Sequence, residues 1–484
     1  MLAAMPTATN PPPRDEPPIS VRLDACPGTL RLHMADDGAL ARVRVPGGVL
    51  TAAQAAALAD AAVRLGDGAL HLTSRGNVQL RGLDGDCGAA LAGLLDAAGL
   101  LPSYRHERVR NIVASPLSGL DGAGHGDVRP WLGALDGLLC ASEAATALSG
   151  RFLFALDDGR GDVASLGADV TLIASGAAGA ASGDAASGPV EGAASSSAAS
   201  GPVEGAASGG AVLHIGGAGG ALRVRGTDAP RAALVAAEVF LDTAAESRSR
   251  AWRVSDLPDG TEELVRETAR RLDAAGIGCT YAAGTSLPTG AAPAPGVVSG
   301  PDGHRALSVL APLGTLTAAQ WRLLAEVARA DGAGEVRLTP WRGVVVPGLD
   351  HAAADARLGD LAAAGLITDP ASPWHGVGAC IGRPGCAKSL ADVRADAATA
   401  LGTGGGLPVY WSGCARRCGH PQGDWVDVVA EQDGYRVSVR GTSPEGPPPA
   451  TVTEPTPPTA PAALAAAVAS ARTATACTHT PLTQ

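Results

Sequence analysis

The chain has 484 residues, with 46% hydrophobic and 18% charged residues and a formal net charge of −11 at pH 7. This length exceeds a single hydrophobic core, so we expect two to four domains in a soluble globular protein. The acidic balance argues against a nucleic-acid-binding surface. No apolar run is suited to a signal peptide or to a bilayer span. We therefore expect a cytoplasmic protein whose nine cysteines stay reduced.

A βαββα unit follows a Pro-rich N-terminal tail. A strand is predicted at 40–45, and Thr51 is a suitable N-cap for the Ala/Leu-rich helix that comes next. A strand pair or hairpin is predicted over 69–81, followed by a second helix that ends at Gly99. This order of elements is typical of a ferredoxin-like unit.

The same unit occurs a second time. Leu316–Leu366 aligns without a gap with Leu50–Leu100, and roughly half of the positions are identical. The second copy repeats the strand (307–310), the Thr317 N-cap, the strand pair (335–346) and the helix end at Gly365. Two copies so far apart predict two pseudo-symmetric halves that enclose a shared cleft, and not a solenoid.

Two segments have biased composition. Residues 175–211 contain a direct repeat of Ala-Ala-Ser-Gly-Pro-Val-Glu-Gly-Ala-Ala-Ser and are predicted to be a flexible insertion between strands at 169–173 and 211–215. Residues 441–484 are rich in Pro, Thr and Ala, and are predicted to be mostly disordered with one helix at 460–471.

Four cysteines near the C-terminal end have the pattern of metal ligands. Cys380 and Cys386 are separated by five residues, and Cys414 and Cys418 by three. Four thiolates can hold an iron–sulfur cluster or a structural zinc ion. The five-residue gap is wide for zinc, so the spacing favours the cluster, with four ordinary buried cysteines as the alternative. If the repeat alignment is shifted by one residue, Ser115 of the first half falls on Cys380, so only the second half carries these ligands.

Polar and basic side chains are concentrated beside the first strand pair. In strand alternation, Arg75, Asn77 and Gln79 share one face, which suits carboxylate recognition. A solvated strand face is the alternative. A further basic run ends at Arg110, beside Asn111, for which a solvated helix end or linker is the alternative.

Together these residues resemble the nitrite/sulfite reductase haemoprotein family over most of 25–440. The repeat, Thr73-Ser-Arg75 with Gln79, Arg110-Asn111 and the Cys-x5-Cys…Cys-x3-Cys pattern carry the resemblance. It implies that the four cysteines bind a [4Fe–4S] cluster, and that Cys418 also bridges to the iron of sirohaem where that cofactor is present. It further implies that Arg75 and Arg110 hold tetrapyrrole carboxylates or the anion on the iron.

Within the family, the chain is most similar to a branch in which the tetrapyrrole is the substrate and not a cofactor. The resemblance implies an O2-dependent monooxygenase of aerobic cobalamin biosynthesis that hydroxylates a meso carbon of precorrin-3A, after which a ring acetate closes to a lactone. It also implies a mononuclear non-haem iron, whose ligands the sequence does not identify, and a reductant such as NADH or a ferredoxin with its reductase. The segments that carry this similarity are Ala25-Cys-Pro-Gly28, Leu72-Thr-Ser-Arg-Gly-Asn77, Asn111-Ile-Val-Ala-Ser-Pro116 and Gly378-Ala-Cys380.

One departure from the sulfite reductases supports this branch. Their Lys-x-Lys motif matches Arg151-Phe-Leu153 here, so the second cation is replaced by an apolar side chain. Loss of a cation from an oxyanion pocket weakens the stabilisation of transition-state charge. The expected set of residues that bind tetrapyrrole carboxylates is Arg75, Asn77, Gln79, Arg110, Asn111 and Arg151.

The predicted fold is α+β, a pseudo-two-fold duplication of ferredoxin-like βαββα units, each followed by an α/β domain of nitrite/sulfite reductase type. Two alternative functions remain: a sirohaem-dependent, ferredoxin-linked sulfite or nitrite reductase, and a non-catalytic protein stapled by an iron–sulfur cluster or zinc. The expected domains are a disordered tail (1–20), half-domain 1 (21–103), an α/β domain with the insertion (104–250), a linker with half-domain 2 (251–368), a [4Fe–4S]-binding domain (369–440) and the C-terminal tail (441–484).

Overall fold

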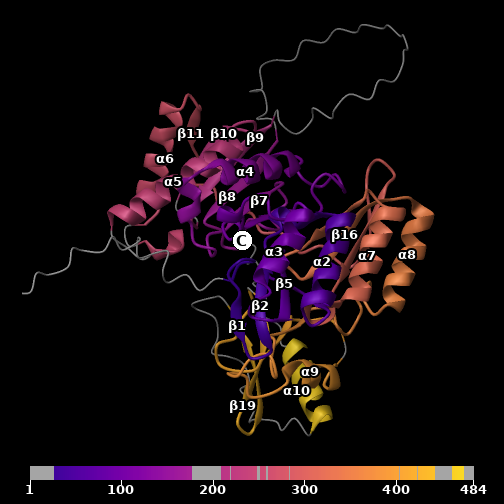
Figure 1. Ribbon diagram of the computed structural model, residues 1–484. Helices are drawn as coiled ribbons and strands as arrows, with labels where there is room; N and C mark the ends of the chain where they lie inside the picture. The colour runs from indigo at the N-terminus through magenta and orange to yellow at the C-terminus, as the bar shows by residue number, and fades with distance from the viewer. Residues whose placement is uncertain are drawn as a thin grey trace, which may run out of the picture.

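Four β-sheets organise the chain. Figure 1 shows two ferredoxin-like halves side by side, a larger sheet with its helices above them, and a C-terminal unit below. No helix among the described residues is long and apolar enough to cross a bilayer. The computed structural model describes residues 27–176, 209–217, 220–247, 251–257, 260–282, 284–402, 404–421, 423–441 and 460–473. The 1–20 tail, most of the 175–211 insertion and most of the C-terminal tail lie outside these residues.

The first half is the predicted βαββα unit. The Thr51 hydroxyl accepts a hydrogen bond from the Gln54 N–H, while the Gln54 side chain accepts one from the Thr51 N–H, so the expected N-cap is a full capping box. The sheet is antiparallel, in the order β1 (His33–Ala35), β2 (Gly38–Val43), β5 (Val78–Leu83), β4 (Ala69–Leu72) and β14 (Thr315–Thr317), and is covered by α2 (Ala52–Leu65) and α3 (Gly88–Ala97).

The second half repeats this architecture. Thr317 and Gln320 form the same capping box as Thr51 and Gln54. The sheet is antiparallel, in the order β12 (Gly296–Ser299), β13 (Arg305–Leu310), β16 (Gly343–Leu349), β15 (Glu335–Leu338) and β3 (Val49–Thr51), and is covered by α7 (Ala318–Ala330) and α8 (His351–Ala363).

The two halves exchange a strand. β14 of the second half pairs with β4 of the first, with Leu316 opposite Leu70, while β3 of the first half pairs with β15 of the second, with Leu50 opposite Val336. These four residues belong to one hydrophobic core that spans both halves. The Trp321 indole N–H on α7 also donates to a carbonyl of α2. The halves therefore form one structural unit and are not two independent domains.

A six-stranded sheet follows the first half. β6, β7 and β8 are parallel, and the remaining neighbours are antiparallel. The predicted strands at 169–173 and 211–215 are confirmed as β8 and β9. The order is β11 (Cys279–Tyr281), β10 (Ala221–Arg225), β9 (Gly210–Ile215), β8 (Val170–Ser175), β7 (Phe154–Asp157) and β6 (Ile112–Ala114), with helices α4 (Arg129–Ala141), α5 (Ala229–Glu246) and α6 (Glu262–Ala274).

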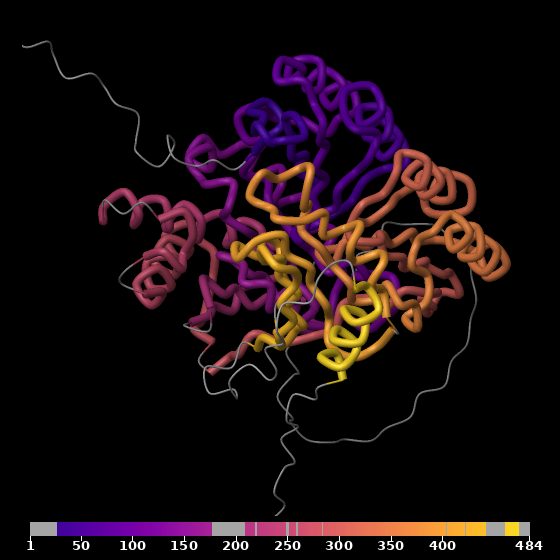
Figure 2. Tube along the Cα trace, turned by 90° about the horizontal axis from the view of Figure 1, so that it is seen from below, coloured from indigo at the N-terminus to yellow at the C-terminus, as the bar shows by residue number. Residues whose placement is uncertain are grey.

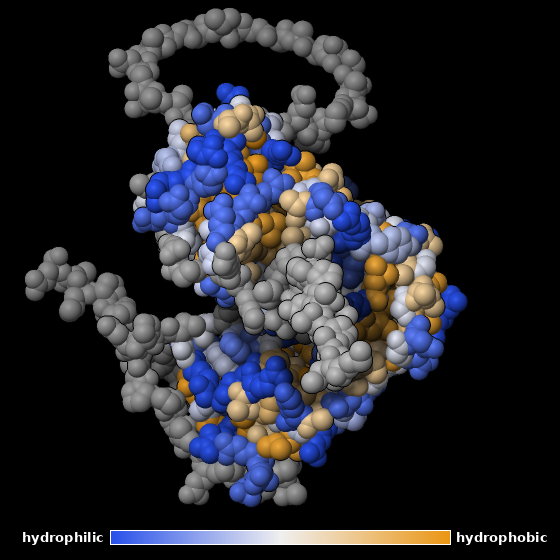
Figure 3. Space-filling view, turned by 60° about the vertical axis from the view of Figure 1, so that its left-hand side comes forward, coloured by the Kyte–Doolittle hydropathy of each residue, from blue (hydrophilic) through white to orange (hydrophobic). Residues whose placement is uncertain are grey.

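The C-terminal unit follows the second half and has a smaller sheet. Like the six-stranded sheet, it begins with three parallel strands. β17, β18 and β19 are parallel, and β20 is antiparallel to β19. In Figure 2 this orange-to-yellow unit lies across both halves. Hydrophilic residues predominate on the face drawn in Figure 3. The strands are β17 (Val377–Ala379), β18 (Val409–Ser412), β19 (Trp425–Glu431) and β20 (Gly434–Arg440), with helices α9 (Val393–Thr399) and α10 (Pro461–Thr473), the second of which was predicted.

Short 3₁₀ helices occupy several of the connections. They are η1 (Pro46–Gly48), η2 (Tyr104–His106), η3 (Ala144–Ala147), η4 (Val254–Asp256) and η5 (Pro312–Gly314). The η1 and η5 turns precede β3 and β14, so they sit at equivalent positions of the two halves.

Candidate functional site

The four cysteines lie in loops at one edge of the C-terminal sheet. Cys380 directly follows β17, and Cys414 comes two residues after the neighbouring parallel strand β18, so parallel pairing carries both loops to the same edge. The Cys380 N–H donates to the Trp411 carbonyl (2.9 Å), and the Gly413 N–H donates to the Cys380 sulfur (3.2 Å). Burial raises the pKa of the Cys380 thiol, and the nearby Cys414 and Cys386 thiols raise it further.

The spacing of the thiols bears on the ligand that they could hold. A tetrahedral zinc ion with Zn–S bonds of about 2.3 Å needs sulfur atoms about 3.8 Å apart. Among the described residues, which include all four cysteines, no three of these sulfur atoms all lie within 4.8 Å of one another. The set is therefore wider than a single ion requires. Four thiols with a backbone N–H directed at one sulfur fit the larger iron–sulfur cluster.

Both halves hold the cysteine loops in place. Arg81 of β5 makes a bidentate ion pair with Asp37 (2.7 and 2.8 Å) and donates to the Gly385 carbonyl, inside the Cys380–Cys386 loop, at 2.9 Å. Arg342 of the second half donates to the Gly419 carbonyl, next to Cys418, at 2.9 Å. The loops are thus positioned by the duplicated scaffold as well as by their own sheet.

A cavity rich in arginine lies beside the first half, with a volume of about 390 Å³. Its walls come from β2 and the segment after it, from the turn between β4 and β5, and from the loop before β7. Four of its lining residues are arginines, and none of the described residues that line it is acidic. We call it the arginine cavity; its lining residues are Pro27, Arg42, Arg44, Thr73, Ser74, Arg75, Asn77 and Arg151.

The structure brings three of the predicted carboxylate-binding residues to this cavity. The Arg75 Nη1 donates to the backbone carbonyl of Arg151 (3.1 Å), which ties the two arginines together. Asn77 is 1% exposed, accepts from the Val45 N–H and donates to Asn111 at 3.1 Å. Asn77 therefore shapes the wall, while the two arginines carry the charge.

The other three predicted residues do not line the cavity. The Arg110 guanidinium is only 7% exposed and forms a bidentate pair with Asp136 of α4, with both contacts at 2.7 Å. Asn111 is fully buried and donates to the Phe152 carbonyl. Gln79 lies on β5, opposite Arg42. The strand alternation predicted for Arg75, Asn77 and Gln79 does not extend to Arg75, because β5 begins only at Val78 and Arg75 lies in the turn before it. A role for Gln79 in carboxylate binding stays a prediction.

Sequence reasoning missed Arg42 and Arg44. They are two residues apart, at the end of β2 and just after it, and both line the cavity. Arg44 donates to the backbone carbonyls of Arg108 and Gly150, each at 3.1 Å, which fixes it to the loop that carries Arg151. The signal was available: an Arg-Val-Arg alternation ends the strand that pairs with the Arg75-bearing hairpin.

A family model, the nitrite/sulfite reductase ferredoxin-like half domain, matches the chain twice, at residues 33–98 and 299–364. These are the two halves that exchange strands. Both halves are therefore similar to the ferredoxin-like half domain of nitrite/sulfite reductases. The predicted α+β fold with duplicated ferredoxin-like halves is thereby confirmed.

Two relatives align with most of the length of the chain. A precorrin-3B synthase from Sinorhizobium sp is 28% identical over 433 residues, covering 88% of this chain and 84% of the relative. A ferredoxin–nitrite reductase from Synechococcus elongatus is 29% identical over 415 residues, covering 79% and 74%. Both names are those of oxidoreductases, which supports an enzymatic role for the chain.

A solved structure has the same fold. The Mycobacterium tuberculosis NirA protein aligns with a TM-score of 0.60 and 19% identity, covering 86% of this chain and 76% of that one. At this identity the likeness concerns the fold alone.

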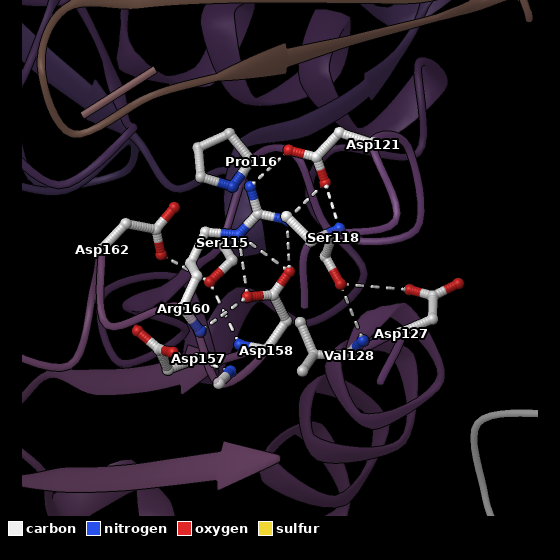
Figure 4. A network of polar contacts seen from close by, with 12 residues as sticks. Ser115, Pro116, Ser118, Asp121, Asp127, Val128, Asp157, Asp158, Arg160 and Asp162 are labelled. Atoms are coloured by element: carbon white, nitrogen blue, oxygen red, sulfur yellow. Dashed lines mark hydrogen bonds and ion pairs between the residues drawn. The ribbon is translucent and has the colours of Figure 1, made fainter. Parts of the chain in front are cut away.

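The six-stranded sheet has a polar network at the place where the C-terminal sheet has its cysteines (Figure 4). Ser115 follows β6 as Cys380 follows β17, and its N–H donates to the Leu156 carbonyl (3.0 Å) as that of Cys380 does to Trp411. The Asp158 N–H donates to the Ser115 hydroxyl (3.2 Å), in the same way that the Gly413 N–H donates to the Cys380 sulfur. The predicted correspondence of Ser115 with Cys380 is therefore confirmed.

Carboxylates surround this serine. The Ser115 hydroxyl donates to Asp162 (2.6 Å), and oxygen atoms of Asp157, Asp158 and Asp162 lie within 4.8 Å of one another (Figure 4). Asp157 accepts four backbone N–H bonds, and Asp158 pairs with Arg160. The loops after β6 and β7, which correspond to the cysteine loops of the C-terminal sheet, are thus held together by hydrogen bonds and by an ion pair.

Proposed function

We propose that the chain is a precorrin-3B synthase, an O2-dependent oxidoreductase that hydroxylates a meso carbon of precorrin-3A with lactone formation. The observation that carries the proposal is the arginine cavity, which gathers four guanidinium groups without an acidic lining residue among those described. Precorrin-3A bears several carboxylates, and guanidinium groups bind carboxylates in charge-assisted, often bidentate pairs. A volume of about 390 Å³ suits the peripheral carboxylate arms better than the whole macrocycle.

The surroundings of Leu153, which matches the second lysine of the sulfite reductase motif, favour oxygenation over anion reduction. Leu153 is 3% exposed and packs in an apolar cluster with Val113 and Val163, against which Trp341 of the second half also packs. A lysine at this position would have to place its ammonium group in an apolar environment, at a high desolvation cost. The surroundings of residue 153 therefore suit an apolar side chain. An apolar side chain cannot bind an oxyanion.

The cysteine centre would complete the redox chemistry. Cys380, Cys386, Cys414 and Cys418 would hold a [4Fe–4S] cluster, which when bound supplies single electrons. The Gly413 N–H directed at the Cys380 sulfur stabilises the thiolate form of that ligand. Arg81 and Arg342 tie the ligand loops to the two halves.

A second candidate is a ferredoxin-linked nitrite or sulfite reductase that holds sirohaem. The similarity to the Synechococcus elongatus ferredoxin–nitrite reductase over 79% of this chain favours it. For this activity the arginine cavity would hold the carboxylates of the cofactor, so the same residues serve either function.

Anaerobic purification followed by pigment, iron and sulfide analysis tests these alternatives. A precorrin-3B synthase contains cluster iron and sulfide without sirohaem, and converts precorrin-3A when O2 and a reductant are added. Arg75→Ala should abolish most of this turnover, while Arg322→Ala, at an exposed ion pair with Asp60, should not. Stoichiometric sirohaem with nitrite or sulfite turnover would refute the synthase. Zinc in place of iron and sulfide would support a non-catalytic, metal-stapled protein.

A further inference from the structure

One wall of the arginine cavity contains a guanidinium stacked on an indole ring. The Arg151 guanidinium carbon lies 4.3 Å from the centroid of the Trp252 ring. Trp252 is half-buried and comes from the segment between α5 and α6, about a hundred residues further along the chain. Among the described residues, the Trp252 indole N–H has no acceptor, so a hydrogen bond of its own does not account for the placement of the ring.

A buried carboxylate locks the two partners together. Asp169 is 1% exposed and accepts from the Leu153 N–H, beside Arg151, at 2.8 Å. It also accepts from the Arg253 Nε (2.7 Å) and the Val254 N–H (2.8 Å), and these two residues directly follow Trp252 in the chain. The loop that carries Arg151 and the segment that carries Trp252 are thus fastened to the same side chain.

Stacking leaves the binding groups of an arginine available. An indole ring contacts the face of a guanidinium, whereas the N–H donors lie in its plane and point outward. Among the described residues, no carboxylate pairs with the Arg151 side chain. Its immobilisation on Trp252 therefore reduces the conformational entropy that a ligand would otherwise remove on binding.

We propose that Trp252 is a positioning residue of the arginine cavity, which holds the Arg151 guanidinium ready for a carboxylate of a tetrapyrrole. The inference deepens the proposed function, since it concerns the same site and a polycarboxylate ligand. It requires that Trp252 act through Arg151 and not through contact with the ligand.

A double-mutant cycle on the full-length protein tests this requirement, with uroporphyrin III as the probe and its dissociation constant as the readout. We expect Arg151→Ala to weaken binding about 10-fold or more, and Trp252→Ala to weaken it about 3- to 10-fold. The double variant should bind as Arg151→Ala does, because the indole then has nothing to position. Trp252→Phe, which keeps an aromatic face, should recover most of the affinity.

Several results would overturn the proposal. The first is multiplication of the two single effects in the double variant, which would mean that Trp252 acts independently of Arg151. The others are unchanged binding in Trp252→Ala or Arg151→Ala, and failure of the wild-type protein to bind the probe. Melting temperatures of all variants show whether a loss of affinity reflects unfolding, and Arg322→Ala serves as the surface control.

The synthase assignment and the positioning role of Trp252 can be refuted independently of each other. If the cycle shows full coupling but precorrin-3A is not converted with O2 and reductant, the positioning role stands and the synthase assignment falls. If precorrin-3A is converted but the two effects multiply, the assignment stands and the role of Trp252 falls.

Discussion

Asp162 offers a test of the buried network beside the six-stranded sheet. Its side chain is 1% exposed, one oxygen accepts from the Ser115 hydroxyl, and the other has no hydrogen-bond partner among the described residues. Burial raises the pKa of this carboxyl from 3.8 to about 7, and the negative charge of Asp157 adds to the effect. The Asp162→Asn variant replaces the carboxyl with a neutral group of nearly the same shape.

The sign and size of the effect follow from this pKa. Above pH 4 the carboxyl is ionised in the unfolded chain but stays protonated in the folded one, so the wild-type protein loses stability as the pH rises towards 7. A rise in pKa from 3.8 to about 7 corresponds to an upper limit of about 4 kcal/mol at pH 8. The substituted amide cannot ionise, and its oxygen can still accept from Ser115. We therefore expect Asp162→Asn to gain stability relative to the wild type as the pH increases from 5 to 8.

Urea unfolding of both proteins at pH 5, 6, 7 and 8 measures this difference. Asp60→Asn, at an exposed ion pair with Arg322, controls for the loss of a surface carboxylate. A difference between wild type and Asp162→Asn that stays constant with pH would show that Asp162 does not change its protonation in this range. A variant that is less stable than the wild type at pH 8 would refute the assignment of an uncompensated buried charge.

Three further outcomes are expected. Cys380→Ser should lower the iron and acid-labile sulfide content of anaerobically purified protein to a small fraction, and full retention would exclude this residue as a ligand. Arg75→Ala should weaken uroporphyrin III binding about 10- to 100-fold, as for loss of a charge-assisted hydrogen bond, while Arg322→Ala should leave it unchanged. Thr317→Ala should lower the free energy of unfolding by about 1 kcal/mol through loss of an N-cap, and an unchanged urea midpoint would contradict the capping role.

Local signals in the sequence predicted the elements of each half. Thr51 and Thr317 are N-caps with a glutamine three residues later, and that pattern acts within one turn of helix. The strand exchange could not be predicted in the same way. Thr315 contacts His71 across 244 positions of the chain, and no local pattern records such a partner.

The candidate site was predicted in part, for a similar reason. Arg75 and Arg151 line the cavity as expected from the motifs around them. Arg110 does not, because Asp136 of α4 lies beside it and turns its charge inward. A sequence shows that both residues exist but not that they meet. Arg42 was overlooked because its contribution depends on the pairing of β2 with β5.

The strand exchange between the halves also has a consequence for synthesis on the ribosome. The edge of β4 pairs with β14 (Thr315–Thr317), so the first sheet stays incomplete until some 240 more residues have been translated. Such long-range pairing slows folding and leaves a strand edge exposed to other chains in the meantime. A gene fragment that ends before β14 would therefore yield a nascent half prone to aggregation, and its solubility should be restored when the missing half is co-translated.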